Sequence, residues 1–194
     1  ITIAPDYSPS AIHADYHVPV EPGSDAALAL GMCHVIIEES LYDPVFVREQ
    51  TDLAMLVRTD TKRFLRQQEL TGAGRDDQFY FLDRKTGDVA EASLTTLALG
   101  DVDPALEGSH QVTLANGSTA EVVPAFAILK EQLAGYTPEK ASAMCATNAE
   151  TIRALARKVA TRRTNILLGF DAGKYYHGDL MERSMCLLLG LTAN

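Results

Sequence analysis

The sequence predicts an α/β fold in which a mostly parallel sheet is flanked by helices and carries a small β-hairpin insertion. A strand, a loop and a helix follow one another near both ends of the chain, and this order is typical of parallel sheets. Two hairpin signals in the middle interrupt the order. We therefore expect an α/β half over residues 1–71, a hairpin insertion over 72–123 and a second α/β half over 124–194.

The first half begins with short extended segments at residues 1–4 and 17–20. Between them, residues 5–10 contain two prolines and several turn-forming side chains, so this stretch is predicted to be a loop. Ser24 is a suitable N-cap for the helix that follows, with Asp25 in its first turn.

That helix extends to about Glu39 and is apolar on nearly all sides, which indicates deep burial. Asp43 followed by Pro44 starts another helix, because proline is favoured at the first helical position.

The middle of the chain contains two turn signals, Thr86-Gly87 and Asn116-Gly117, each between two apolar segments. Asn-Gly is a strong hairpin signal because a type I′ turn needs positive φ at both central residues. The two signals predict two hairpins.

The second half is dominated by helices. Their predicted starts are Pro124, Thr137-Pro138 and Asn148. Gly135 is expected just after the C-terminal end of the helix that starts at Pro124. Residues 164–168 are predicted to form an apolar strand, and the loop 169–178 then leads to a buried final helix over 179–191.

Charge and composition exclude several classes of partner. The 194 residues contain 17 Lys and Arg against 26 Asp and Glu, a net charge of −9, which argues against nucleic acid and an anionic membrane surface. No apolar run reaches the roughly 18 residues of a membrane span. Cys33, Cys145 and Cys186 are too far apart for a zinc or disulfide pattern, and we expect all three to be small buried hydrophobes.

The first candidate ligand site combines the loop after the first strand with the turn Gly23-Ser24-Asp25. Ligands of open α/β sheets bind beyond the carboxyl ends of strands, beside helix N-termini. Gly23 permits close approach of the backbone. Asp25 either caps its own helix or accepts two parallel hydrogen bonds from the N1–H and 2-amino groups of a guanine.

The second candidate is the loop 169–178, which has three glycines and Lys174. It suits a pyrophosphate or another polar ligand but matches neither common phosphate-binding motif, so a structural turn is the alternative. His13 and His17 need a helix to share a metal, and nearby prolines disfavour one. We assign no metal ligand and no catalytic residue.

Several motifs, taken in order, resemble the molybdopterin oxidoreductases of the dimethyl sulfoxide reductase family. The motifs are Ile3-Ala4-Pro5-Asp6-Tyr7-Ser8-Pro9-Ser10-Ala11, His13-Ala14-Asp15, Val18-Pro19-Val20, Pro22-Gly23-Ser24-Asp25-Ala26-Ala27-Leu28, Thr51-Asp52-Leu53, Tyr136-Thr137-Pro138-Glu139 and His177-Gly178-Asp179. The resemblance covers nearly the whole chain except the insertion. Within the family, the sequence most resembles the catalytic subunits of nitrate, chlorate, perchlorate and selenate reductases, and of dimethylsulfide and ethylbenzene dehydrogenases.

The resemblance implies the residues that bind the cofactor, molybdenum-bis(molybdopterin guanine dinucleotide). Those implied to hold the guanosine end of one pterin are Ala4, Pro5, Asp6, Tyr7, Ser8, Gly23, Ser24 and Asp25, which makes residues 1–71 the guanosine-binding half. Leu168, Gly169 and Ala172 match a second contacting stretch. Many relatives have Gln in place of Ala172 and Asp in place of Ala4, so Ala172 is expected to offer only its backbone, and a ribose contact shifts to Asp6.

The activity implied by the resemblance is transfer of an oxygen atom, with two electrons, between molybdenum and a small substrate. An oxyanion of the nitrate, chlorate or selenate type is our first choice of substrate. A dimethylsulfide or hydrocarbon dehydrogenase is the alternative within the family. A non-enzymatic ligand-binding or assembly domain is the alternative outside it.

The resemblance also implies parts beyond these 194 residues, so we expect an internal, inactive segment of a catalytic alpha subunit. Family members carry an iron–sulfur cluster in an N-terminal cysteine-rich part, a molybdenum ligand and a further C-terminal domain. The implied partners in electron transfer are an iron–sulfur beta subunit and a haem subunit, in anaerobic respiration. The implied location is the periplasm, with the cytoplasmic face of the membrane as the alternative.

Overall fold

The computed structural model describes residues 1–169 and 172–194, which form two compact units. Unit 1 comprises Ile1–Asp43 and Gln132–Asn194, and unit 2 comprises Pro44–Glu131. Their limits differ from those of the three predicted segments, because residues 44–71 and 124–131 group with the hairpins. Among the described residues, no helix has both the length and the apolar character needed to cross a membrane.

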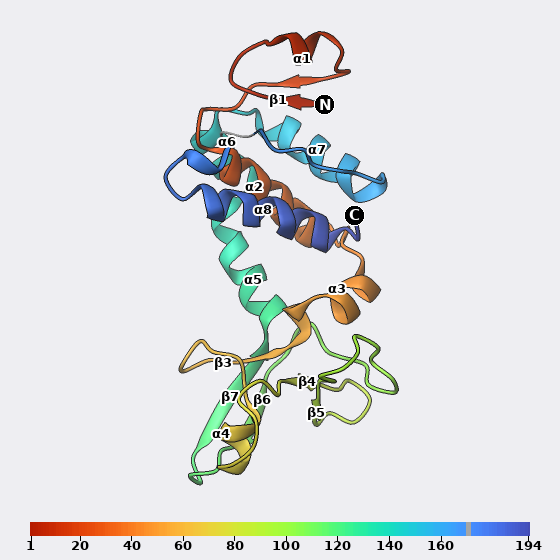
Figure 1. The fold of residues 1–194 in the computed structure, drawn as a ribbon, viewed down its shortest axis with the longest axis vertical. Helices are drawn as coiled ribbons and strands as arrows, with labels where there is room; N and C mark the ends of the chain where they lie inside the picture. Colours follow the sequence, from red (N-terminus) through yellow and green to blue (C-terminus); the bar gives the residue numbers. More distant parts are fainter. Residues whose placement is uncertain (170–171) are drawn as a thin grey trace. The chain divides into compact units, whose positions relative to one another are not determined.

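Unit 1 is built around one buried helix, α2 (Figure 1). Its elements are β1 (Thr2–Ile3), α1 (Pro9–Ile12), β2 (His17–Val18), α2 (Asp25–Glu38), η2 (Ala134–Tyr136), α6 (Pro138–Cys145), α7 (Ala149–Thr161), η3 (Ala172–Lys174) and α8 (Gly178–Leu191). The helix α2 packs against α6, α7 and α8. Its apolar side chains are therefore buried on several sides, as the sequence predicts.

The helix starts of unit 1 follow the predicted capping residues in two cases. The Thr137 hydroxyl accepts a hydrogen bond from the Lys140 N–H at the start of α6, and the Asn148 side chain accepts one from the Glu150 N–H at the start of α7. Gly135 differs from the prediction, because it lies inside the 3-10 helix η2 rather than after a helix end.

The prediction of a mostly parallel sheet is wrong, although the mixed α/β character is confirmed. Among the described residues only β1 and β2 pair in parallel, with Thr2 opposite His17. Residues 163–169 form no regular secondary structure, and Leu167 is 98% exposed. An apolar segment becomes a strand only when a neighbouring strand pairs with its backbone N–H and C=O groups, and residues 163–169 have no such neighbour in the part of the chain that the structure describes.

Gly31 allows α6 and α7 to approach α2 closely. A Cβ atom at this position would lie 2.7 Å from the Cβ atom of Ala141 and 3.3 Å from the Cγ2 atom of Ile152. Both of these residues are fully buried, so they have little room to move.

We expect Gly31→Ala to destabilise the chain, although alanine is the better helix former by about 1 kcal/mol. The added methyl group must displace Ala141 or Ile152, and such overpacking costs roughly 1–3 kcal/mol. Urea unfolding of the 194-residue chain measures the change. The matched control is Gly190→Ala in α8, where the new Cβ atom meets nothing within 4 Å and stability should rise. Equal gains in the two variants would contradict the packing argument.

Unit 2 contains two antiparallel sheets and the start of helix α5. Its elements are α3 (Pro44–Gln50), η1 (Asp52–Ala54), β3 (Leu56–Arg58), α4 (Gln67–Thr71), β4 (Tyr80–Leu82), β5 (Val89–Glu91), β6 (His110–Thr113), β7 (Thr119–Pro124) and α5 (Ala125–Leu133), of which the last two residues belong to unit 1. The β4–β5 and β6–β7 hairpins confirm both predicted hairpins. The Asn116-Gly117 turn is not of type I′, because only Gly117 has positive φ. Strand β7 also pairs with β3, which gives the order β3-β7-β6.

The carboxylate of Asp83 holds the turn between β4 and β5 to a neighbouring loop. It accepts hydrogen bonds from the backbone N–H groups of Lys85 and Asp103, both at 3.1 Å, and from the Thr86 hydroxyl at 3.3 Å. The two backbone donors stabilise the ionised form and lower the pKa of Asp83 below its usual value of 3.8.

We expect the ionised carboxylate of Asp83 to stabilise the folded chain, and we expect this contribution to depend on pH. Its pKa is lower in the folded than in the unfolded chain, so the contribution is present above about pH 4 and is lost as the pH falls through the folded pKa. Urea unfolding between about pH 5 and pH 3 compares the natural chain with Asp83→Asn. The difference between the two should shrink as the pH falls, and a constant difference would contradict this role.

The cysteines follow the prediction in two of three cases. Cys33 and Cys145 are buried, and burial raises the pKa of the Cys33 thiol to about 12. Cys186 is exposed, so the expectation that all three are buried is wrong for this residue.

Candidate functional site

A pocket of about 240 Å³ lies in unit 1 beside the N-terminal end of α2. Its walls come from β1, α2, α7, α8 and residues 164–169. The lining residues are Ile1, Ile3, Asp25, Leu28, Ala29, Met32, Leu155, Val159, Thr164, Asn165, Ile166, Leu167, Leu168, Gly169, Met181, Met185 and Leu188. A mostly apolar lining with a few polar groups is typical of small-molecule sites.

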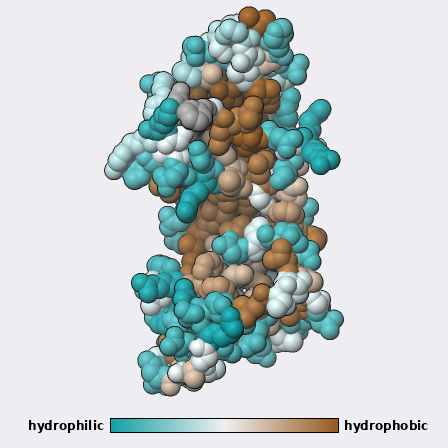
Figure 2. All heavy atoms as spheres, in the orientation of Figure 1, coloured by the Kyte–Doolittle hydropathy of each residue, from teal (hydrophilic) through white to brown (hydrophobic). Residues whose placement is uncertain are grey.

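Hydrophobic side chains also gather on the surface of this unit, as Figure 2 shows. Four of the pocket's apolar lining residues, Ile1, Ile3, Leu167 and Leu168, are each more than one-third exposed. The apolar wall is thus accessible to a ligand from solvent.

Asp25 is the one acidic residue among the described residues that line this pocket. It is half-buried at the first position of α2. Within the described part of the chain its carboxylate has no hydrogen bond and no ion pair, and α2 has no side-chain cap. Of the two alternatives, capping is therefore not observed, and the carboxylate is available to a ligand.

Ser24 occupies the predicted N-cap position but does not cap the helix. Its hydroxyl donates instead to the carbonyl oxygen of Glu21, at 2.6 Å. The N-terminal end of α2 therefore keeps backbone N–H groups without a side-chain acceptor, and such an end attracts negative charge.

Gly23 brings the two predicted ligand loops together. Its φ is +81°, and a Cβ atom here would lie 3.3 Å from the Cδ1 atom of Tyr175. Both the positive φ and the close approach to the ring favour glycine. Because Tyr175 directly follows η3, the turn 23–25 and the loop 169–178 are neighbours.

The loop 4–8 follows β1, and its first residue is firmly held. The Ala4 N–H donates to the carbonyl oxygen of Val18 at 3.2 Å, and the Ala4 carbonyl oxygen lies 3.2 Å from the Nε2 atom of His17. The Tyr7 ring meets the His17 ring edge-on, with centroids 5.3 Å apart.

The rest of this loop faces outward. Pro5 and Asp6 are exposed, and Ser8 precedes α1, with its N–H donating to the carbonyl oxygen of Asp6 at 3.1 Å. Residues 4–8 and 23–24 are not among those that line the pocket, and their role in cofactor binding stays a prediction.

The second predicted stretch is described in part. Leu168 and Gly169 line the pocket with Asp25, and Ala172 is the first residue of η3. The predicted loop also includes Phe170 and Asp171, which lie outside the described residues.

The apolar walls of the pocket were not identified from the sequence. A signal exists for part of them: Leu28, Ala29 and Met32 follow Asp25 at spacings of three, four and seven residues, which places all four on one face of α2. The same spacing relates Met181, Met185 and Leu188 on α8. Ile1 and Ile3 have no such signal.

The side chains that the structure describes form no metal-ligand cluster. Across residues 1–169 and 172–194, no three His, Cys, Asp or Glu residues are grouped closely enough to bind a metal ion. The carboxylate of Asp25 lies among mostly apolar lining residues, so this pocket can offer a hydrogen-bond acceptor to the polar edge of a small ligand.

Comparisons with known proteins relate the chain to one group of enzymes, although no protein-family model matches it. The perchlorate reductase subunit alpha of Dechloromonas aromatica (strain RCB) is 40% identical over 221 residues, which cover 100% of this chain and 24% of that protein. The dimethylsulfide dehydrogenase subunit alpha of Rhodovulum sulfidophilum is 38% identical over 201 residues, which cover 100% of this chain and 22% of that protein.

The chain therefore spans about a quarter of the length of the curated relatives that it matches. Among solved structures, acetylene hydratase from Pelobacter acetylenicus has a TM-score of 0.55 and 20% sequence identity, over 98% of this chain and 16% of that chain. This likeness supports the fold alone. Because the sequence matches extend over all 194 residues at about 40% identity, the chain belongs to the dimethyl sulfoxide reductase family of molybdopterin oxidoreductases.

Proposed function

We propose that these residues bind the guanosine end of a bis-molybdopterin guanine dinucleotide cofactor, in a molybdenum enzyme that reduces an oxyanion. The first part of the proposal rests on the half-buried carboxylate of Asp25, which lines a mostly apolar pocket and has no partner among the described residues. The relative named perchlorate reductase, at 40% identity, supports the second part.

In this proposal the side chains of the 194 residues bind and orient the guanine base of the cofactor. The Asp25 carboxylate accepts two parallel hydrogen bonds from the guanine N1–H and 2-amino groups. The apolar residues that line the pocket, among them Leu168, surround the base and exclude water, which strengthens these hydrogen bonds. The cofactor, when bound, supplies the molybdenum centre that transfers an oxygen atom together with two electrons.

A dimethylsulfide dehydrogenase is the second candidate for the activity of the whole protein. The relative with this name is 38% identical, nearly as similar as the perchlorate reductase. Assays of the native protein with perchlorate, chlorate and nitrate as electron acceptors, and with dimethyl sulfide as electron donor, distinguish the two candidates.

The partners and the location belong to the same proposal. Both relatives are named as alpha subunits, which supports an assembly with further subunits. We infer an iron–sulfur cluster outside these residues, an iron–sulfur beta subunit and a haem subunit. We place the assembly in the periplasm, with the cytoplasmic face of the membrane as the alternative. Metal analysis and haem spectra of the native complex, with cell fractionation, test these points.

The test of the cofactor is chemical analysis of the native protein. Acid hydrolysis should release guanosine nucleotide in a ratio of two per molybdenum, because each cofactor contains two guanine dinucleotides. Native protein without molybdenum and guanosine would support a non-enzymatic binding or assembly domain and overturn the proposal.

A further inference from the structure

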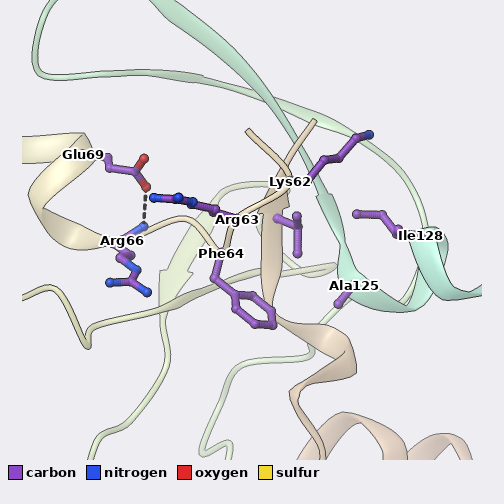
Figure 3. A pocket seen from close by; sticks show the side chains of 8 residues that line it. Lys62, Arg63, Phe64, Arg66, Glu69, Ala125 and Ile128 are labelled. Atoms are coloured by element: carbon purple, nitrogen blue, oxygen red, sulfur yellow. Dashed lines mark hydrogen bonds between the residues drawn. The ribbon is translucent and has the colours of Figure 1, made fainter. Parts of the chain in front are cut away.

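Unit 2 contains a larger pocket, of about 600 Å³, next to the turn that follows β3. Figure 3 shows the apolar lining residues of this pocket: Phe64 lies on one side of it, and Ala125 and Ile128 of α5 lie on the other. Val57 of β3 also lines it. Among the described residues, none lines both this pocket and the pocket of unit 1, so the argument for this site does not depend on the proposed cofactor function.

The turn after β3 places basic residues at this pocket. The Lys62 N–H donates to the carbonyl oxygen of Arg58 at 3.0 Å, and the Arg58 N–H donates to the carbonyl oxygen of Arg63 at 2.9 Å. Val57 and Phe64 form the bridge that continues this turn. Figure 3 shows the Lys62 side chain on the side of Ile128, whereas the Arg63 side chain points the other way, toward Arg66 and Glu69; all three basic residues line the pocket.

The charges of these three residues are not neutralised within the described part of the chain. Glu69 also lines the pocket, but its carboxylate accepts hydrogen bonds from the Arg58 guanidinium at 2.6 Å and from the Arg66 backbone N–H at 3.0 Å. The side chains of Lys62, Arg63 and Arg66 have no carboxylate partner there, and all three residues are exposed. The Arg66 guanidinium contacts only a ring, 5.8 Å from the centroid of Phe79.

We propose that this pocket binds an acidic peptide segment of a partner protein. Apolar side chains of the segment enter between Phe64 and Ile128, and its carboxylates pair with Lys62, Arg63 and Arg66. An apolar centre with an exposed charged rim is the usual anatomy of a protein interface. Three unpaired cations require more than one negative charge, which a peptide supplies and a simple monocarboxylate does not.

The size of the pocket agrees with a peptide occupant. A volume of about 600 Å³ lies within the range of pockets that enclose a whole drug-sized molecule, so more than one side chain fits. The rim charges are solvent-exposed, and exposed charge pairs increase the rate of encounter and the specificity more than the affinity.

The test uses a fluorescein-labelled peptide in which Asp and Glu residues flank a Phe-Leu pair. Fluorescence anisotropy measures its binding to the native protein that carries these residues. We expect saturable binding that weakens as salt is added, because salt screens exposed charges. The variant Lys62→Gln/Arg63→Gln/Arg66→Gln should bind roughly tenfold more weakly.

The matched control is Arg75→Gln/Arg84→Gln/Lys85→Gln, which removes three positive charges from unit 2 outside the pocket and should bind like the natural protein. Melting curves of both variants establish that they are folded. The proposal is overturned if the pocket variant binds normally, or if a peptide with Asn and Gln in place of the acids binds equally well. Absence of binding to the native protein also overturns it, as does equally tight binding of benzoate, which would indicate a small organic anion.

Discussion

Asp25→Ala is expected to deprive the native protein of its guanosine cofactor while leaving the fold intact. The free carboxylate in the pocket of unit 1 accepts no hydrogen bond from its own helix, so little folding stability depends on it. Charge-assisted hydrogen bonds contribute roughly 1.5–3 kcal/mol each, and the variant leaves two guanine donors unpaired. We expect a loss of about 2–5 kcal/mol in cofactor binding.

Molybdenum and guanosine per subunit, measured beside the melting temperature, check this expectation. The matched control is Asp179→Ala, which removes an exposed acid from the first turn of α8 outside the pocket and should keep the cofactor. Asp25→Asn should also lose the cofactor, because its amide group puts a donor where guanine needs an acceptor. Full occupancy in Asp25→Ala with a lower melting temperature would show that the residue serves only the helix.

Ile36→Ala is expected to have the opposite effect: it should lower the folding stability strongly but remove no contact with the ligand. Ile36 is fully buried in α2 and does not line the pocket. Truncation of a buried isoleucine to alanine typically costs about 2–5 kcal/mol, because apolar contacts are lost and a cavity remains. Such a loss is a substantial share of the roughly 5–15 kcal/mol that stabilises a typical domain.

Urea unfolding of the 194-residue chain measures this loss. The control is Ile12→Ala, since Ile12 is 63% exposed and its truncation should change the free energy of unfolding by less than about 0.5 kcal/mol. Similar losses in the two variants would show that α2 is not the centre of the core of unit 1.

Local signals in the sequence determined most helices and both hairpins. Thr137 and Asn148 cap the helices that they were predicted to start, and Asn116-Gly117 connects β6 and β7. Capping and tight turns involve residues that are two to four positions apart, so their energetics are contained in a short stretch of sequence.

The candidate site was predictable in part. The order of motifs indicated a cofactor that contains guanine and singled out Asp25, yet the capping alternative stayed open. Within the described residues the structure shows no cap at this helix start, because Ser24 donates to Glu21 and Asp25 remains unpaired. Guanine binding by Asp25 stays a prediction. It also placed Leu168 in the pocket of Asp25, although the two are far apart in the sequence.

Tertiary structure alone decided the sheets and the pockets. The apolar residues 164–168 resemble a strand but have no partner strand among the described residues, whereas β3, which lacks a clear signal, pairs with the distant β7. Likewise, the exposure of Cys186 on α8 depends on which face of the helix is covered. Strand pairing and burial depend on segments that are remote in the sequence, so the residues of one segment determine its local conformation but not the neighbours that complete it.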